Sequence, residues 1–169
     1  AARPHQAVDA VVAAANLIMS AQTLVSRSVD PNRSAVVTFG SVEVGTAQNI
    51  IAQDALLKGT VRSTHDQTRT TTLDGLQRMV ESIGRMHGVE AELSFESRIP
   101  AVINDIECAE IARKAAMLSP GVHSVESQGV ASLGAEDFAF YQQMIPGCMV
   151  RFGASCGKGA GVSHSGTYT

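Results

Sequence analysis

One histidine near the end of the sequence, His164, could bind a metal ion. It lies in residues 153–166, which contain five glycines in fourteen positions. A neutral imidazole is a common metal ligand, and a glycine-rich loop leaves its side chains accessible. A solvated loop histidine fits the same pattern, and no CxxC pair accompanies it. The residues alone therefore leave both interpretations open for His164.

A second candidate is a polar pair, Asn49 and Arg62, thirteen positions apart. In an extended segment over residues 55–63, alternation places Arg62 on one face with Lys58 and Thr60, opposite the apolar side chains. A guanidinium on such a face suits planar recognition of a carboxylate, and a neutral amide can add a second hydrogen bond. A solvated strand face is the alternative.

Two adjacent acids, Glu136 and Asp137, begin a predicted short helix in "GAEDFAFYQQM". Consecutive helical residues do not face one site, so at most one of them can take part in chemistry. Acidic residues are also favoured in the first turn of a helix because they complement its dipole. Helix capping is therefore the alternative role for both.

Two further catalytic motifs are incomplete. The stretch "GASCGKG", residues 153–159, resembles a phosphate-binding loop, but the spacing is one residue short and glycine follows the lysine. Serine, histidine and aspartate are all present, yet no GxSxG motif marks a nucleophilic serine. Neither motif supports a function.

Composition limits the remaining classes of function. The 169 residues are 44% hydrophobic with a net charge of −3, which predicts a globular chain and gives nucleic acid no electrostatic attraction. An RNA-binding sheet would also need an aromatic platform and a basic face. The longest apolar stretch is interrupted by Asn16 and is shorter than a membrane span. Three scattered cysteines favour a reducing compartment, here the cytoplasm.

The elements that must position these residues follow from periodicity. Helical spacing of apolar residues predicts a helix from Gln6 to about residue 27, and another from residue 67 that stops at Gly88. Residues 35–44 and 55–63 have the β-branched composition of strands, and residues 89–96 alternate strictly. The apolar face of the first helix is predicted to contain Val8, Val11, Val12, Ala15, Ile18 and Met19.

This α-β-β-α-β order matches a ferredoxin-like β-α-β-β-α-β unit without its first strand. A second module follows residue 100. It begins with a helix that Asn104 is predicted to cap, with Glu107 three positions later, and continues through the short helix to a buried strand over residues 148–154. The predicted class is α/β, with an α+β domain over residues 1–100 and a partial α/β domain over residues 101–169.

Taken together, the motifs resemble those of the M20 metallopeptidase and amidohydrolase family, in its N-acyl-amino-acid, hippurate and auxin-conjugate hydrolase branch. Five stretches carry the resemblance in the family's order: "AARPHQAVDAV", "AQNIIAQDALLKGTVRS", "IPAVIND", "LGAEDFAFYQQMIPGCMVRFGA" and "SHSGTY". They extend over almost the whole sequence. The resemblance implies that residues 1–100 are a lid and dimerisation domain and residues 101–169 the last part of a zinc-peptidase-like catalytic domain.

The resemblance also implies roles for individual residues. Asn49 and Arg62 match lid residues that hold the carboxylate end of the substrate, and His5 stands beside them as a further substrate-binding residue. His164 matches the C-terminal ligand of a binuclear site for zinc, manganese or cobalt. Glu136 matches a residue that lies next to the metal site without binding the metal. No residue of this sequence matches a catalytic residue.

The family's remaining metal ligands and its catalytic base precede the lid, and this sequence does not contain them. We therefore expect a fragment that is inactive by itself, from a homodimeric enzyme that hydrolyses N-acyl amino acids and binds neither nucleic acid nor membrane. The alternative is a non-catalytic dimerisation or binding module.

Overall fold

The computed structural model describes residues 1–153, which divide into two units. The first unit comprises Ala1–Ala101 and Gln128–Glu136, and the second comprises Val102–Ser127 and the described residues 137–153. The segment Gln128–Glu136 therefore groups with the first unit although it follows residue 100. The mixture of helices and strands agrees with the predicted α/β class.

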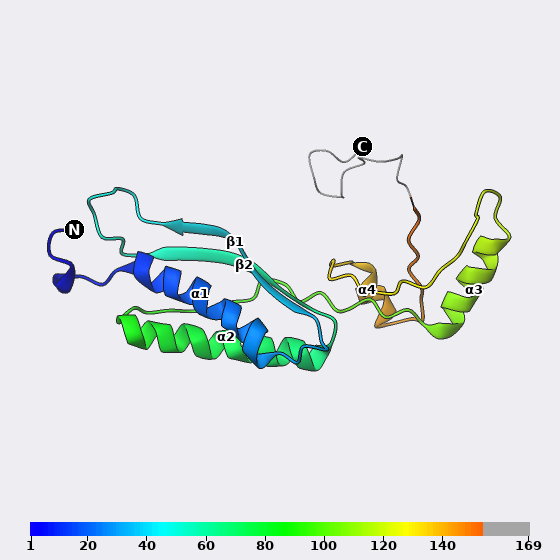
Figure 1. Cartoon of the computed structure of the whole chain (residues 1–169), viewed down its shortest axis with the longest axis horizontal. Helices are drawn as coiled ribbons and strands as arrows, with labels where there is room; N and C mark the ends of the chain where they lie inside the picture. Colours follow the sequence, from blue (N-terminus) through cyan, green and yellow to red (C-terminus); the bar gives the residue numbers. More distant parts are fainter. Residues whose placement is uncertain (154–169) are drawn as a thin grey trace. The chain divides into compact units, whose positions relative to one another are not determined.

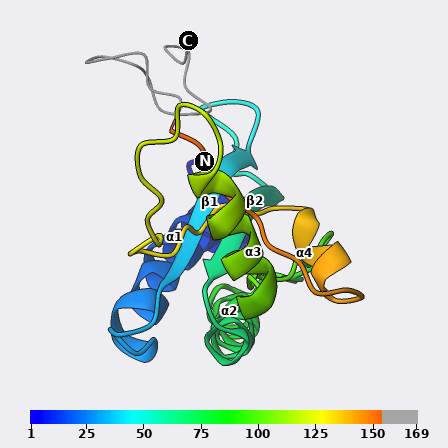
Figure 2. The same cartoon turned by 90° about the vertical axis from the view of Figure 1, so that its right-hand side faces the viewer.

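The first unit is a β-hairpin with two helices on one face (Figure 1). β1 (Ala35–Val44) pairs antiparallel with β2 (Ala55–Ser63), and a bulge lies between Phe39 and Ser41. α1 (Ala10–Ser28) and α2 (Asp66–His87) lie side by side beneath the hairpin, as the end-on view in Figure 2 also shows. The predicted order of helix, two strands and helix is confirmed.

The core of this unit joins both helices to the inner face of the hairpin. Leu24 of α1 and Leu76 of α2 are buried with Val37 of β1. Gly75 lets the helices approach, because a Cβ atom there would collide with the Leu24 side chain. The residues packed around this centre are Val25, Phe39, Val61, Met79 and Leu93.

The first helix differs from the prediction in its start and its buried face. It begins at Ala10, where the carboxylate of Asp9 accepts a hydrogen bond from Val11 N at 2.9 Å, and Pro4–Gln6 form a separate 3-10 turn, η1. Four residues of the predicted face, Val8, Val11, Val12 and Met19, are between 46% and 70% exposed. The face that packs inward is instead made of Ala10, Ala13, Ala14, Ala21 and Leu24.

Both faces of α1 have helical spacing, so periodicity alone cannot choose between them. The smaller side chains face inward because they allow the helix to approach its neighbours closely. By length and composition α1 could also cross a membrane, so the expectation that no segment reaches that length was wrong. In this structure the inward face of α1 packs against the hairpin and α2, and 28% of its apolar stretch is buried.

Residues 89–96 form no strand, which corrects the prediction from their alternation. α2 ends as predicted, at Gly88 with φ 69°, and the chain continues so that Leu93 reaches the core. A strand needs a hydrogen-bonded neighbour. In a ferredoxin-like unit that neighbour would be the first strand, and the described residues contain only the β1–β2 pair.

The second unit contains α3 (Ile106–Met117) and the short α4 (Phe138–Gln142). α3 is capped by Asp105 and not by Asn104, since the Asp105 carboxylate accepts a hydrogen bond from Cys108 N at 3.0 Å. The strand predicted over residues 148–154 is absent from its described part, residues 148–153.

Candidate functional site

Arg62 lies where β2 nears its end, on the face of the hairpin that α1 and α2 do not cover. It pairs with Val36, and alternation places it with Thr60 and Lys58, as predicted. Its guanidinium donates a hydrogen bond from Nη1 to the carbonyl oxygen of Leu133 at 2.9 Å, in a partly buried position. A residue of the hairpin is thereby joined to the loop that precedes Glu136.

The two basic side chains on this face, Lys58 and Arg62, differ in whether a carboxylate pairs with them. Lys58 forms an exposed ion pair with Glu43 across the hairpin, with 3.9 Å between Nζ and Oε1. Arg62 has no carboxylate partner within the described residues, and a neutral carbonyl takes one of its five N–H groups. The guanidinium therefore retains donors that can bind a carboxylate in a forked arrangement.

Asn49 lies in the connection between the two strands, at the end of the hairpin far from Arg62. Its backbone carbonyl accepts a hydrogen bond from the amino group of Ala1 at 3.3 Å, and its side chain is exposed. This contact brings the start of the chain to the same end of the hairpin as Asn49 (Figure 1).

His5 belongs to this same end. It is an exposed residue of η1, between the amino group of Ala1 that binds Asn49 and the first residue of α1. A hydrogen bond from Ala10 N to Ala52 O at 3.1 Å anchors the beginning of α1 to the hairpin connection. His5 and Asn49 therefore lie at the same end of the hairpin, on segments that backbone hydrogen bonds tie together.

The three predicted substrate-binding residues thus fall into two groups. Arg62 lies seven positions along β2 from Ala55, which is next to the hairpin connection, so these two residues are about 23 Å apart. An N-acyl amino acid spans only about 7 Å when fully extended. One copy of the chain cannot place Asn49 and Arg62 on the same small substrate.

Glu136 is exposed and closes the segment that carries Leu133. Neither it nor Asp137 lies in the first turn of a helix, because α4 begins at Phe138, and the Asp137 side chain makes no capping hydrogen bond. The prediction that both acids lie in the first turn of a helix is therefore wrong, and Asp137 occupies the N-cap position of α4 without a side-chain hydrogen bond. Glu136 stays a predicted neighbour of the metal site, three residues beyond the carbonyl that binds Arg62.

His164 lies outside the described residues, so its role stays a prediction. Within residues 1–153, no group of three or more histidine, cysteine, aspartate or glutamate side chains is arranged to hold a metal ion. The side chains of this part of the chain do not fit a binuclear metal site, and we assign no chemical step to a metal held by them.

Asn104 does not cap α3, although the sequence predicted that it would, but joins two segments of the chain. Its side chain clamps the backbone of Met149, donating from Nδ2 to the carbonyl and accepting from the amide, both at 2.9 Å. Asn104 and Asp105 thus have different tasks, one joining two segments and the other capping α3. An Asn-Asp pair before a helix signals a cap, but it does not reveal which residue provides it.

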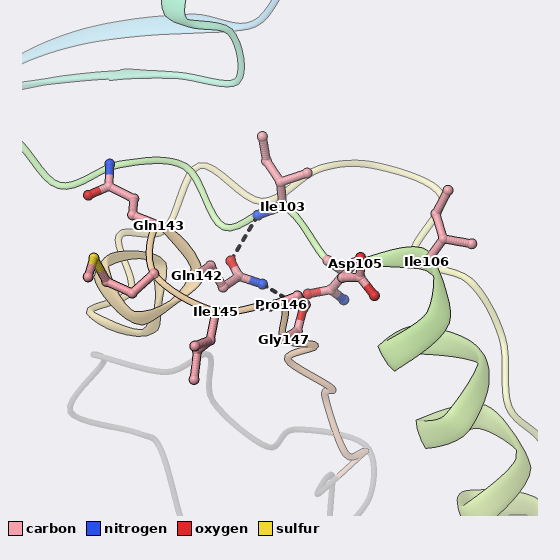
Figure 3. A pocket seen from close by; sticks show the side chains of 10 residues that line it. Ile103, Asp105, Ile106, Gln142, Gln143, Ile145, Pro146 and Gly147 are labelled. Atoms are coloured by element: carbon pink, nitrogen blue, oxygen red, sulfur yellow. Dashed lines mark hydrogen bonds between the residues drawn. The ribbon is translucent and has the colours of Figure 1, made fainter.

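The second unit also contains a surface pocket of about 550 Å³ beside this clamp (Figure 3). Gln142 crosses it, accepting from Ile103 N at 3.1 Å and donating to Gly147 O at 2.9 Å. Its one carboxylate, from Asp105, is already used by the helix cap. The backbone hydrogen bond from Cys108 is the main reason that the pKa of Asp105 is lowered. The pocket therefore offers no free acid or base.

The sequence of this chain is similar to one protein family and to several of its members. The family described as Peptidase family M20/M25/M40 matches residues 5–168. N-acetyldiaminopimelate deacetylase of Streptococcus uberis is 38% identical over 156 residues, which are 90% of this chain and 40% of that protein. N-acetylcysteine deacetylase of Bacillus subtilis is 34% identical, over 90% of this chain and 39% of that protein.

Two solved structures are also similar to this chain in fold and in sequence. A protein assigned as an aminohydrolase from methicillin-resistant Staphylococcus aureus has a TM-score of 0.72 and 32% identity, covering 86% of this chain and 37% of that one. A dinuclear metal-binding peptidase of the M20 family from Bacillus subtilis has a TM-score of 0.65 and 31% identity, covering 83% and 35%. The chain spans about 40% of the length of the curated relatives that it matches.

Proposed function

Because this chain belongs to peptidase family M20/M25/M40, we propose that it forms the lid and C-terminal part of a metal-dependent amidohydrolase acting on N-acyl amino acids. Two relatives bear the names of N-acetyl deacetylases, which favours N-acetyl amino acids over hippurate-like substrates. A structural relative is described as binding two metal ions, which supports a binuclear centre of zinc, manganese or cobalt. His164 is the ligand that we propose from this chain.

The observation that supports this proposal most strongly is the state of Arg62. It lies on the uncovered face of the hairpin, it has no carboxylate partner among the described residues, and Leu133 O holds it at 2.9 Å. A partly buried guanidinium held in place by a neutral carbonyl keeps its full charge for an anion. We assign it the free carboxylate of the amino-acid part of the substrate.

In this arrangement the chain's own residues bind and orient the substrate. Arg62 fixes the carboxylate end, so the amide bond to be hydrolysed lies at a set distance from it. Asn49 donates a hydrogen bond to the substrate from its neutral side chain, and His5 contacts the substrate beside Asn49. Bound metal would supply the activated water in the complete enzyme.

The distance between Asn49 and Arg62 supports a homodimer. About 23 Å separates Ala55 from Arg62 along β2, and Asn49 lies in the connection before Ala55, so a site that uses both residues needs Asn49 from one copy and Arg62 from another. A two-fold axis would then create two equivalent sites, since each copy gives one residue to each. The alternative, a dimerisation or binding module without catalysis, predicts the same dimer but no hydrolysis.

The test of this function replaces Arg62 in the enzyme that contains these residues. Arg62→Ala should raise KM for N-acetyl amino acids by about 100-fold, since charge-assisted hydrogen bonds to a carboxylate are lost. The same variant should change KM little for substrates whose carboxylate is capped as an amide. Steady-state kinetics with both substrate types measures this difference.

Lys58→Ala provides the matched control. Lys58 lies on the same face of β2, but Glu43 pairs with it and both side chains are exposed. This variant should leave KM for both substrates close to that of the parent enzyme. Equal effects of Arg62→Ala on free and capped substrates would contradict the role assigned to Arg62.

A further inference from the structure

Three hydrogen bonds hold the start of α3 beside the segment at residues 147–149. Asn104 exchanges two of them with the backbone of Met149, both at 2.9 Å. Asp105 N donates the third to Gly147 O at 3.0 Å. Asn104 and Asp105 on one segment are thus held to Gly147 and Met149 on the other, so the residues next to these contacts are also held close together.

Each of these segments carries a free cysteine. Cys148 lies between Gly147 and Met149, the two residues that make the contacts. Cys108 lies three residues after Asp105 in the first turn of α3, on the same side of the helix, and its amide donates to the Asp105 carboxylate at 3.0 Å. Both side chains are half-buried.

The electrostatics of Cys108 are consistent with this proximity. Burial is the main cause that raises the pKa of its thiol, and the neighbouring Asp105 adds to it. The charge of an ionised Cys148 also raises this pKa, by more than that of Glu107, which is adjacent in sequence to Cys108.

We propose that Cys108 and Cys148 form a reversible disulfide when the protein meets a peroxide. A Cys148 thiolate attacks one oxygen of hydrogen peroxide, giving a sulfenic acid and releasing hydroxide, which takes up a proton to become water. The Cys108 sulfur then attacks the sulfenic sulfur, and the second oxygen leaves as water. The two thiols lose two electrons and two protons, and the peroxide is reduced to two water molecules.

This order of attack follows from the environment of Cys108. Its raised pKa reduces its thiolate fraction further, so we assign Cys108 the second step, and the reaction should become faster as pH rises. The bond would fix α3 to the segment that leads into residues 154–169, where His164 lies. A reducing compartment, which we propose from the cysteine content, would return both thiols after the oxidant is removed.

Peptide mapping tests the proposal directly. The three cysteines fall in different tryptic peptides, residues 99–113, 115–151 and 152–158. We expect the Cys156→Ser protein to lose both thiols when hydrogen peroxide oxidises it. Digestion should then give a peptide in which residues 99–113 are linked to residues 115–151, with both parts coming from the same chain. Dithiothreitol should restore both thiols.

Asn104→Ala is the matched variant, because it keeps both cysteines and removes the clamp. It should form the linked peptide about tenfold more slowly than its parent, since the effective concentration of one thiol near the other falls. Disulfide formation in the urea-unfolded chain gives the rate without native contacts. The proposal is overturned if the folded protein links no faster than the unfolded chain, or if peroxide oxidises the two thiols separately.

Discussion

Asp105 and Arg62 illustrate how hydrogen bonds decide which charged side chains remain available. The carboxylate of Asp105 is used by its own helix, through the amide of Cys108, whereas Arg62 meets only the carbonyl of Leu133. Alternation along β2 placed Arg62 correctly on the polar face. Its contact lies 71 positions away in the sequence, and no local pattern reports such a distant neighbour.

The cap at Asp105 predicts a pH dependence of α3. The Cys108 amide lowers the pKa of this carboxyl below its ordinary value of 3.8. The stabilisation is therefore complete above pH 3.8 and is lost as pH falls through the lowered pKa in the folded chain. The amide proton and nitrogen shifts of Cys108, followed by NMR, should titrate with this lowered pKa.

Asp105→Asn is the control for that titration. Asparagine also accepts a hydrogen bond at a helix N-cap, but it carries no titrating charge. The variant should keep α3 and show a flat Cys108 shift in the same pH range. A persistent titration in Asp105→Asn would mean that another group controls the cap.

The helices and the hairpin show which elements a sequence can specify locally. The β1–β2 pair, α2 and its end at Gly88 followed from composition, spacing and the left-handed position that glycine favours. The buried face of α1 did not, because its alanines and its valines recur with the same period. Residues 89–96 alternate like a strand, but alternation cannot supply the neighbouring strand that a sheet requires.

The close contact of α1 and α2 predicts the effect of a single methyl group. Gly75→Ala would place a Cβ atom against the buried Leu24 side chain. Overpacking costs about 1–3 kcal/mol, and alanine regains about 1 kcal/mol of helix propensity. We expect a net loss of about 1 kcal/mol in the free energy of unfolding, measured by urea denaturation.

Gly40→Ala is the matched substitution for that measurement. A Cβ atom at this exposed bulge meets no other atom within 4 Å. Its effect on the free energy of unfolding should stay within about 0.5 kcal/mol. If Gly75→Ala is as stable as Gly40→Ala, the α1–α2 contact is not limited by the size of residue 75.

At the scale of the whole molecule, the proposed site needs more than one copy of the chain. Asn49 and His5 lie at one end of the hairpin and Arg62 at the other, and the chain spans about 40% of the length of its relatives. The sequence predicted the residue types of the site through their order along the chain. It could not show their separation, which follows from the length of β2.

Mixing two inactive variants of the enzyme tests the central claim most directly. Asn49→Ala and Arg62→Ala each remove one half of the proposed composite site, so each homodimer should hydrolyse N-acetyl amino acids poorly. After subunit exchange at equal amounts, half of the dimers contain both variants. One site of each mixed dimer then has both residues intact, and activity should return to about one quarter of the parent value. Activity that stays at the level of the separate variants would contradict the shared site.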